Sequence, residues 1–234
     1  MRDVSFEDTK KSWDNYYKVL NNEDAEFQKE FERCTLNHTW RNSIRIIKTK
    51  TNIKQTDKII DAGCGWGRLL LGLIQDFAGL TIVAMDYQKD ALTRGKKLIG
   101  EENNSNTIRW EEGDLQALPY EDNQFDIVYS GRVFQHLQDP YKAASEIVRV
   151  LRKNGRFVVF MQNRLCPLNY NYYSRLFRPG QVKNWFKGLG LKKLSVSSMD
   201  FCPKSIASMT IEKTIEKIPI LNLFGGKVVV WGEK

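Results

Sequence analysis

A short apolar run, an acidic residue and three alternating glycines constrain the fold of this chain more than any other part of its sequence. The stretch Ile59-Ile60-Asp61-Ala62-Gly63-Cys64-Gly65-Trp66-Gly67-Arg68 predicts a strand, then a glycine turn, then a helix. Glycine allows positive φ and has no Cβ, so a ligand can lie against such a turn. The free N–H groups at the start of a helix favour a polar or anionic group there. Because the dinucleotide pattern G-x-G-x-x-G would place glycine at Arg68, we predict a nucleotide-type cofactor other than NAD.

Strand-like and helix-like segments alternate from residue 58 onward. Strands are predicted over Lys58–Asp61, Thr81–Asp86, Ile108–Glu112, Phe125–Ser130, Arg156–Phe160, Lys192–Ser198 and Val228–Trp231. Helices are predicted over Arg68–Gln75, Gln88–Glu101, Tyr141–Leu151, Gln181–Leu189 and Ser205–Glu216. This order predicts an α/β fold with a doubly wound parallel sheet and right-handed crossovers.

Two segments stand outside this alternation. Residues 1–57 contain helical patterns over Asp8–Leu20 and Asp24–Lys48, and we predict that they form an N-terminal helical cap or lid on a domain spanning residues 58–234. The stretch Met161–Arg178 is long, irregular and rich in tyrosine. Long loops in compact domains are usually lids or binding loops, and a cover for an exposed sheet edge is the alternative.

Composition argues against several classes of protein. The four cysteines (Cys34, Cys64, Cys166 and Cys202) are scattered and there are only two histidines, so we expect no structural zinc site and a reduced, cytoplasmic setting. No run of 18 apolar residues occurs and the N-terminus lacks a secretory pattern, so we expect no membrane span.

The net charge of +8 is unevenly distributed, because residues 152–234 contain 15 Lys and Arg against 4 Asp and Glu. This excess favours an anionic partner, and a basic solvated surface is the alternative.

Three aspartates follow successive predicted strands. Asp61 ends the first, Asp86 ends the second and Asp114 follows the third. In an open parallel sheet, ligands bind outside the carboxyl ends of the strands. Asp86 lies about 20 residues beyond the first glycine, the spacing of a carboxylate that binds ribose hydroxyls. We predict that Asp114 accepts from the exocyclic amine of an adenine and that Leu115 and Tyr87 offer apolar surface to its ring.

Residues 58–160 resemble the core of class I S-adenosylmethionine-dependent methyltransferases, and most closely the small-molecule branch that includes the ubiquinone and menaquinone C-methyltransferases. The glycine stretch is similar to the first motif of that family almost position for position. The segments that match its later motifs are Glu112–Tyr120, Asn123–Ser130, Gln135–Pro140 and Val150–Arg156.

The resemblance implies a Rossmann-like sheet of seven strands with an antiparallel last strand. Its implied cofactor is S-adenosylmethionine, with S-adenosylhomocysteine as the product. The same resemblance implies that Gly63 and Gly65 contact the methionine part, Asp86 the ribose, and Asp114 with Leu115 the adenine. It also implies that the Ser130 carbonyl meets the amino group of the cofactor.

Further roles are hypotheses. His136 is the candidate base for acceptors that must lose a proton, and a structural role in its loop is the alternative. Tyr17 and Arg41 are predicted to close over the methionine end, and packing of an amphipathic helix is the alternative.

The acceptor is expected to be a small anionic or phosphate-bearing molecule. It would be bound by an insertion over about residues 161–190, where four basic residues offer charge-assisted hydrogen bonds: Arg164, Arg175, Arg178 and Lys183.

An RNA or protein methyltransferase and a non-catalytic cofactor-binding protein remain alternatives. Nucleic acid is disfavoured as a substrate, because many amino-methylating enzymes have an Asn/Asp-Pro-Pro-aromatic tetrapeptide where this chain reads Ser130-Gly131-Arg132-Val133. The chain is expected to be a monomer or a homodimer, and no metal is predicted.

Overall fold

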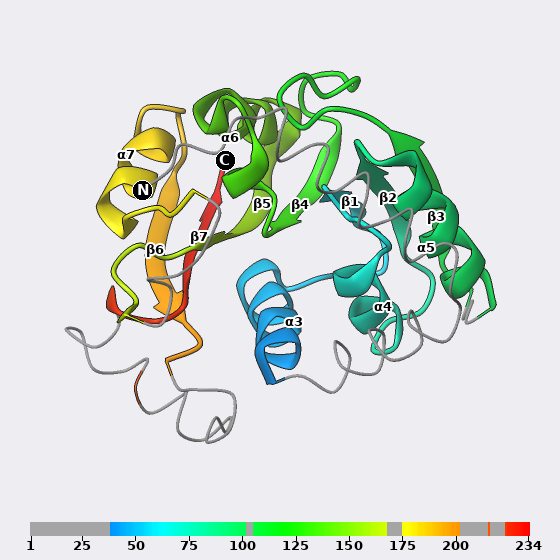
Figure 1. The fold of residues 1–234 in the computed structure, drawn as a ribbon. Coiled ribbons are helices and arrows are strands. Elements are labelled where there is room, and N and C mark those ends of the chain that lie inside the picture. Colours follow the sequence, from blue (N-terminus) through cyan, green and yellow to red (C-terminus); the bar gives the residue numbers. More distant parts are fainter. Residues whose placement is uncertain (1–37, 102–104, 168–174, 202–214, 216–222) are drawn as a thin grey trace.

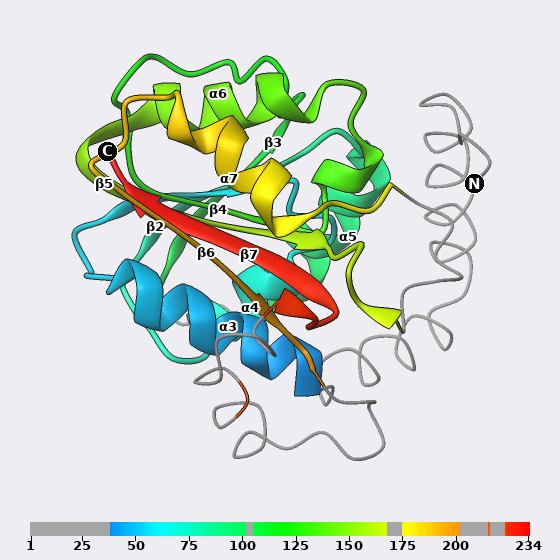
Figure 2. The same ribbon diagram turned by 90° about the vertical axis from the view of Figure 1, so that its left-hand side faces the viewer.

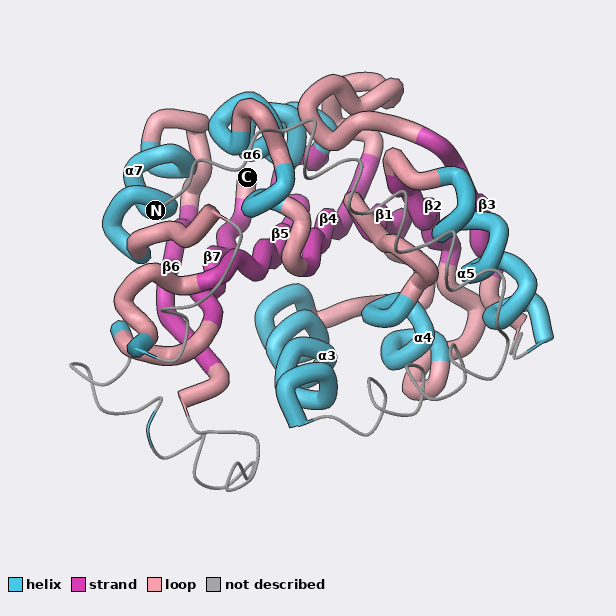
Figure 3. Tube along the Cα trace, viewed as in Figure 1, coloured by secondary structure: helices cyan, strands magenta, loops and turns pink. Residues whose placement is uncertain are grey.

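The computed structural model describes residues 38–101, 105–167, 175–201, 215 and 223–234. Its helices and strands alternate along most of this range (Figures 1 and 3). In chain order they are α3 (His38–Thr51), β1 (Lys58–Ala62), α4 (Arg68–Ile74), β2 (Thr81–Asp86), α5 (Lys89–Glu101), β3 (Thr107–Glu112), β4 (Phe125–Gly131), η1 (Phe134–His136), α6 (Pro140–Val150), β5 (Leu151–Gln162), α7 (Pro179–Lys187), β6 (Lys193–Met199) and β7 (Lys227–Glu233).

The strands form one seven-stranded sheet in the order β3-β2-β1-β4-β5-β7-β6. Strands β1 to β5 pair in parallel, and β7 pairs antiparallel with both β5 and β6. This arrangement confirms the prediction of a doubly wound Rossmann-like sheet whose last strand is antiparallel.

Helices cover both faces of the sheet (Figure 2). On one face, α3, α4 and α5 pack with residues such as Ile44, Leu70 and Leu92 in one buried cluster. On the other face, α6 and α7 pack with residues such as Ile147 and Phe186 in a second cluster. The central strands are buried on both sides, which explains why they are almost continuously apolar in sequence.

Several boundaries differ from the sequence prediction. The helix predicted over Tyr141–Leu151 ends at Val150, because Leu151 pairs with Phe125 and begins β5. Strand β5 then runs to Gln162, which pairs with Lys227, so the predicted irregular segment begins later than Met161.

Some expected elements fall outside the described residues. These are the helix predicted over Asp8–Leu20, most of that over Ser205–Glu216, and residues 24–37 of the second N-terminal helix. The described part of that second helix is α3, which packs against the sheet beside α4 through Trp40, Ile44 and Ile47 (Figure 1). Residues 1–37 of the cap or lid predicted over residues 1–57 therefore lie outside the described residues, and α3 is its described part.

Strands β1 and β4 mark the point where the strand order reverses. From β1 the chain continues to β2 and β3 on one side, and β4 then pairs with the other side of β1. Because β7 is antiparallel, its first residue, Lys227, lies at the same edge as the last residues of the parallel strands. An open α/β sheet binds its ligands at this edge, beside the switch point.

Candidate functional site

The glycine turn after β1 is held to the end of β2. The backbone N–H groups of Gly63 and Cys64 both donate to the Met85 carbonyl, at 2.8 and 2.9 Å. Gly63 has a φ of +82°, and a Cβ at this position would overlap the side chain of Val133. The turn therefore requires glycine at position 63 and presents bare main chain at the ligand edge of the sheet.

Asp86 is tied to the same turn. Its carboxylate accepts a hydrogen bond from the Gly65 N–H at 2.7 Å and another from the Gln88 N–H at 2.8 Å. Burial raises the pKa of Asp86, and the two hydrogen bonds oppose that rise. The structure thus places Asp86, the aspartate at the end of β2, directly beside the glycine turn that follows β1.

Asp114 is oriented by a neighbouring amide. The backbone N–H of Gln116 donates to the Asp114 carboxylate at 2.8 Å, and the side-chain amide of Gln116 donates to the same group at 3.1 Å. Leu115 is buried in the hydrophobic cluster on the α6 side, whereas Tyr87 is 45% exposed. Of the two residues predicted to offer apolar surface, Tyr87 is therefore the one whose ring is accessible.

Asp61 is a buried carboxylate without hydrogen bonds of good geometry. Its side chain is 1% exposed and neither oxygen accepts such a bond from the described residues. Burial raises its pKa well above the usual range, the Tyr129 hydroxyl on the adjacent strand partly opposes the rise, and the Asp86 carboxylate adds to it. The hydroxyl of Ser130, one residue further along β4, is likewise buried without a partner. Unsatisfied buried polar groups are uncommon and suit a site that a ligand completes.

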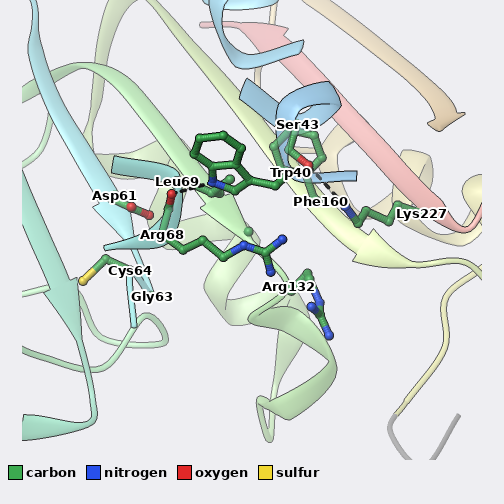
Figure 4. A pocket seen from close by; sticks show the side chains of 11 residues that line it. Trp40, Ser43, Asp61, Gly63, Cys64, Arg68, Leu69, Arg132, Phe160 and Lys227 are labelled. Carbon is green, nitrogen blue, oxygen red and sulfur yellow. Dashed lines mark hydrogen bonds between the residues drawn. The ribbon is translucent and has the colours of Figure 1, made fainter. Parts of the chain in front are cut away.

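A pocket opens beside Asp61 and Gly63, between β1, β4, β5 and β7 on the side of α3 and α4. Three cationic residues are among those that line it, Arg68, Arg132 and Lys227 (Figure 4). Apolar walls come from Trp40, Leu69 and Phe160, and the remaining lining residues are Ser43, Asp61, Gly63, Cys64 and Gly131. The pocket thus has an acidic end at β1 and a basic side toward β7.

Arg132 adopts a backbone conformation that is unusual for arginine. It follows the last residue of β4 with a φ of +65°. Its N–H donates to the Phe160 carbonyl at 3.0 Å, and its own carbonyl accepts from the Gln135 side chain at 2.6 Å. The left-handed region costs a residue other than glycine about 1–2 kcal/mol. Such strain is often found at functional sites.

Lys227 is the most buried of the three cations. Its side chain is 9% exposed, and its ammonium contacts the Asp200 carboxylate at 3.0 Å and the Ser43 hydroxyl at 3.2 Å. Burial lowers the pKa of Lys227 to about 8; Asp200 opposes this, and the charges of Arg132 and Arg68 add to it. Sequence reasoning missed this residue, whose one visible sign is a lysine directly before the apolar run Val228–Val230.

The residues predicted to bind the acceptor's anion lie elsewhere. The side chains of Arg164, Arg175, Arg178 and Lys183 are exposed, and Arg175 donates to the Leu137 carbonyl at 3.1 Å. Arg41 is also exposed, on α3, whereas its neighbour Trp40 lines the pocket and donates to the Arg68 carbonyl at 2.7 Å. Tyr17 lies outside the described residues.

His136 ends the short helix η1 and is not among the residues that line the pocket. Burial, together with the positive charge of Arg132, lowers the pKa of His136 to about 4. The imidazole is therefore neutral at pH 7 and a weak base. A good general base has a pKa near the working pH.

We expect the turnover of His136→Gln to follow the wild-type pH profile between about pH 5.5 and 8, because a group with this lowered pKa does not titrate in that range. Steady-state rates across this range check the expectation. A step between pH 6 and 7 that is present in the wild type and absent from His136→Gln would contradict the lowered pKa and favour His136 as the base.

Two kinds of feature are absent from the described residues. Within residues 38–101, 105–167, 175–201 and 223–234, no three His, Cys, Asp or Glu side chains cluster as metal ligands. No helix in the described part of the chain is long and apolar enough to cross a membrane.

The fold and the site together define a class of protein that binds a nucleoside-type cofactor. A glycine turn, two carboxylates beside it and a third after β3 lie along the carboxyl edge of a doubly wound sheet. The antiparallel β7 adds a basic side chain at the same edge.

Comparison with known proteins identifies this class. Residues 60–159 match the family model described as a methyltransferase domain. The demethylmenaquinone methyltransferase of Lactobacillus johnsonii is 29% identical over 133 residues, which cover 55% of this chain and 54% of the relative. The chain spans about half the length of the curated relatives that it first matches.

Solved structures show the same fold. A possible histamine N-methyltransferase from Thermotoga maritima superposes with a TM-score of 0.64 at 19% identity, covering 89% of this chain and 97% of the other. An N-methyltransferase from Haemonchus contortus, solved with phosphomonomethylethanolamine and S-adenosylhomocysteine, has a TM-score of 0.63 at 18% identity, covering 82% of this chain and 52% of the other. Residues 60–159 thus match a methyltransferase domain, and the fold is that of the class I S-adenosylmethionine-dependent methyltransferases, whose cofactor is S-adenosylmethionine.

Proposed function

We propose that this protein transfers the methyl group of S-adenosylmethionine to a small acceptor that carries a phosphate or carboxylate group. The observation that supports the proposal best is the convergence of Arg68, Arg132 and Lys227 on the pocket that begins at Asp61 and Gly63. Lys227 is paired with Asp200, and Arg68 and Arg132 add further positive charge near it, so the lining favours an anionic ligand.

The residues present fit the cofactor. Asp61 has two buried oxygens without good donors, which suits the ammonium of the methionine part. The missing Cβ of Gly63 lets the main chain approach that part closely. Asp86 would hold the ribose hydroxyls, Asp114 would accept from the adenine amine, and the carbonyl of Ser130 would meet the cofactor's amino group.

Methyl transfer from a sulfonium depends mainly on how the protein positions the two reactants. When bound, the cofactor supplies a methyl carbon that is activated by a sulfonium. The chain's own residues must place an acceptor atom in line with that carbon and exclude water, and such positioning accounts for much of the rate in reactions of this type. Trp40, Leu69 and Phe160 supply apolar walls for this purpose.

Two relatives support a small acceptor. One is named for demethylmenaquinone, and the structural neighbour from Haemonchus contortus was solved with phosphomonomethylethanolamine. The latter acceptor bears a phosphate group, as we propose for this chain.

The proposal predicts different salt dependences for the two substrates. Raising the ionic strength from about 0.02 to 0.3 M should raise the acceptor KM by about fivefold or more and leave the cofactor KM nearly unchanged, because salt screens attraction to a cationic pocket. The assay measures release of S-adenosylhomocysteine with a panel of amines, phenols and enols, in which each class includes phosphate-bearing, carboxylate-bearing and neutral members. It identifies the acceptor and gives the KM of the acceptor and the KM of the cofactor. Efficient turnover of a neutral acceptor with a salt-independent KM would contradict an anionic substrate.

A further inference from the structure

Lys227 lies at the opposite end of the site from the nucleoside. It is the first residue of β7, and β1 is separated from β7 by β4 and β5 in the sheet. Three strand spacings correspond to about 14 Å. The aspartates assigned to the ribose and the adenine follow β2 and β3, which lie on the far side of β1 (Figure 1). A ligand group at Lys227 therefore lies beyond the methionine end of the cofactor.

Two of the described residues contact the ammonium group of Lys227. An ammonium group has three donors, and Asp200 and Ser43 account for two of them. Asp200 is itself held in place, because the side-chain amide of Asn42 donates to its carboxylate at 3.3 Å and its carbonyl accepts from the Gly226 N–H at 3.0 Å.

The balance of charge around Lys227 is positive. The charged groups that face it are Asp200 after β6, Arg132 after β4 and Arg68 on α4, and the hydroxyl of Ser43 faces it from α3. Asp61 lies across the pocket, three strands away from β7 in the sheet. Among the described residues, Asp200 is thus the carboxylate in contact with Lys227, while Arg132 and Arg68 add positive charge near it.

Arg132 supplies the planar partner for such an anion. Arg132 follows the end of β4 and is one of the residues that line the pocket, and its positive charge acts on Lys227. Its positive φ is a conformation that glycine adopts without strain, so arginine at this position is explained better by its side chain than by its backbone. Arginine presents a rigid pair of donors that matches the oxygens of a phosphate or carboxylate.

We propose that Lys227 and Arg132 together bind one oxyanion of the acceptor, and that Asp200 is the internal counter-ion of Lys227 before that oxyanion arrives. This inference rests on the proposed function and assigns the acceptor's anionic group to particular residues. It places that group at the start of β7 and the end of β4, and not at the basic residues of the segment between β5 and α7.

The experiment measures binding of sulfate to the full chain saturated with S-adenosylhomocysteine, by titration calorimetry. Sulfate is the probe because it does not titrate between pH 6 and 10. Lys227→Met and Arg132→Gly should each weaken sulfate binding by about tenfold or more, and the matched control Lys187→Met, at an exposed site on α7, should not change it. Arg132→Gly should keep or raise the thermal midpoint, because it relieves the positive φ.

A second measurement needs no variant. In the wild type, the sulfate Kd should rise as the pH increases through about 8, where Lys227 loses its proton. Wild-type sulfate binding that is independent of pH from 7 to 9.5, or equal in Lys227→Met and Lys187→Met, would overturn the inference.

Titration with S-adenosylhomocysteine alone separates this inference from the proposed function. Its Kd should be the same within about twofold in the wild type and Lys227→Met, because Lys227 lies beyond the cofactor. If Lys227→Met weakened the cofactor product and left sulfate binding intact, Lys227 would belong to the cofactor site and the inference would be wrong. If the wild type bound no S-adenosylhomocysteine, the proposed function would fail instead.

Discussion

An Asp86→Ala variant is expected to bind S-adenosylhomocysteine at least about 100-fold more weakly than the wild type while remaining folded. Asp86 is proposed to hold the ribose hydroxyls, and it also anchors the Gly65 N–H at 2.7 Å. Hydrogen bonds to a charged group contribute about 1.5–3 kcal/mol each, so the loss of two corresponds to a factor of about 100 or more. Titration calorimetry with the purified variant measures this effect.

Two further variants make the result specific. Asp76→Ala removes an exposed carboxylate that pairs with Lys48, and it should leave the affinity for S-adenosylhomocysteine unchanged. Asp86→Asn keeps one acceptor oxygen and should give an intermediate affinity. A Kd for Asp86→Ala within about threefold of the wild-type value, in a variant with a normal thermal midpoint, would remove Asp86 from the cofactor site.

The sequence predicted the part of the site that depends on local pattern. The glycine turn follows from φ requirements within a few residues, and its structure is as expected at Gly63. Asp86 and Asp114 could be placed because parallel strands end at one edge of the sheet, so the end of each apolar run also marks a position in the site.

The basic side of the pocket depends on contacts that are distant in sequence. Lys227 reaches the site because β7 inserts antiparallel between β5 and β6, and its partners Ser43 and Asp200 come from α3 and from the end of β6. In the sequence, its place directly before the apolar run Val228–Val230 is the one feature that separates this lysine from the other lysines of this region. The excess of positive charge after residue 152 includes Lys227, and the four basic residues predicted to bind the acceptor are not among those that line this pocket.

The beginning of β5 is a second place where contacts distant in sequence decide the structure. The segment Arg152-Lys153-Asn154-Gly155 has the composition of a turn, yet it lies within a continuous strand in which Asn154 has a φ of +65°. Pairing with β4 is interrupted by a register shift there. Neighbouring strands override local preference at this point, and nothing in the local sequence indicates it.

An Asp61→Asn variant is expected to be more stable than the wild type and to bind the cofactor less well. The wild-type carboxylate is 1% exposed and accepts no hydrogen bond of good geometry from the described residues. Asparagine keeps a polar group at this position but removes its charge, and a charged group costs more to bury without a partner than a neutral one. For a gain of about 1–3 kcal/mol, and with about 1 kcal/mol shifting the midpoint of a domain of this size by 2–4 °C, the thermal midpoint at pH 7 should rise by about 2–12 °C.

The gain in stability should depend on pH with a defined sign. The pKa of Asp61 in the folded protein is raised above its usual value of 3.8. The folded state therefore binds more protons than the unfolded state between these two values, and the wild type gains stability as the pH falls through that range. The difference between Asp61→Asn and the wild type should consequently be largest near neutral pH and should shrink toward pH 4.

The matched control is another buried aspartate that has its partners. Asp57 is 2% exposed, accepts from the Lys54 N–H at 2.9 Å and pairs with Arg156 at 3.2 Å, so Asp57→Asn should lower the thermal midpoint. In Asp61→Asn, the affinity for S-adenosylhomocysteine should fall by about 10- to 100-fold, because the cofactor's ammonium loses its counter-charge. If Asp61→Asn lowered the midpoint and left the affinity unchanged, Asp61 would be a structural residue. Opposite changes in the two quantities mean that Asp61 is kept charged for its ligand, at the expense of the ligand-free fold.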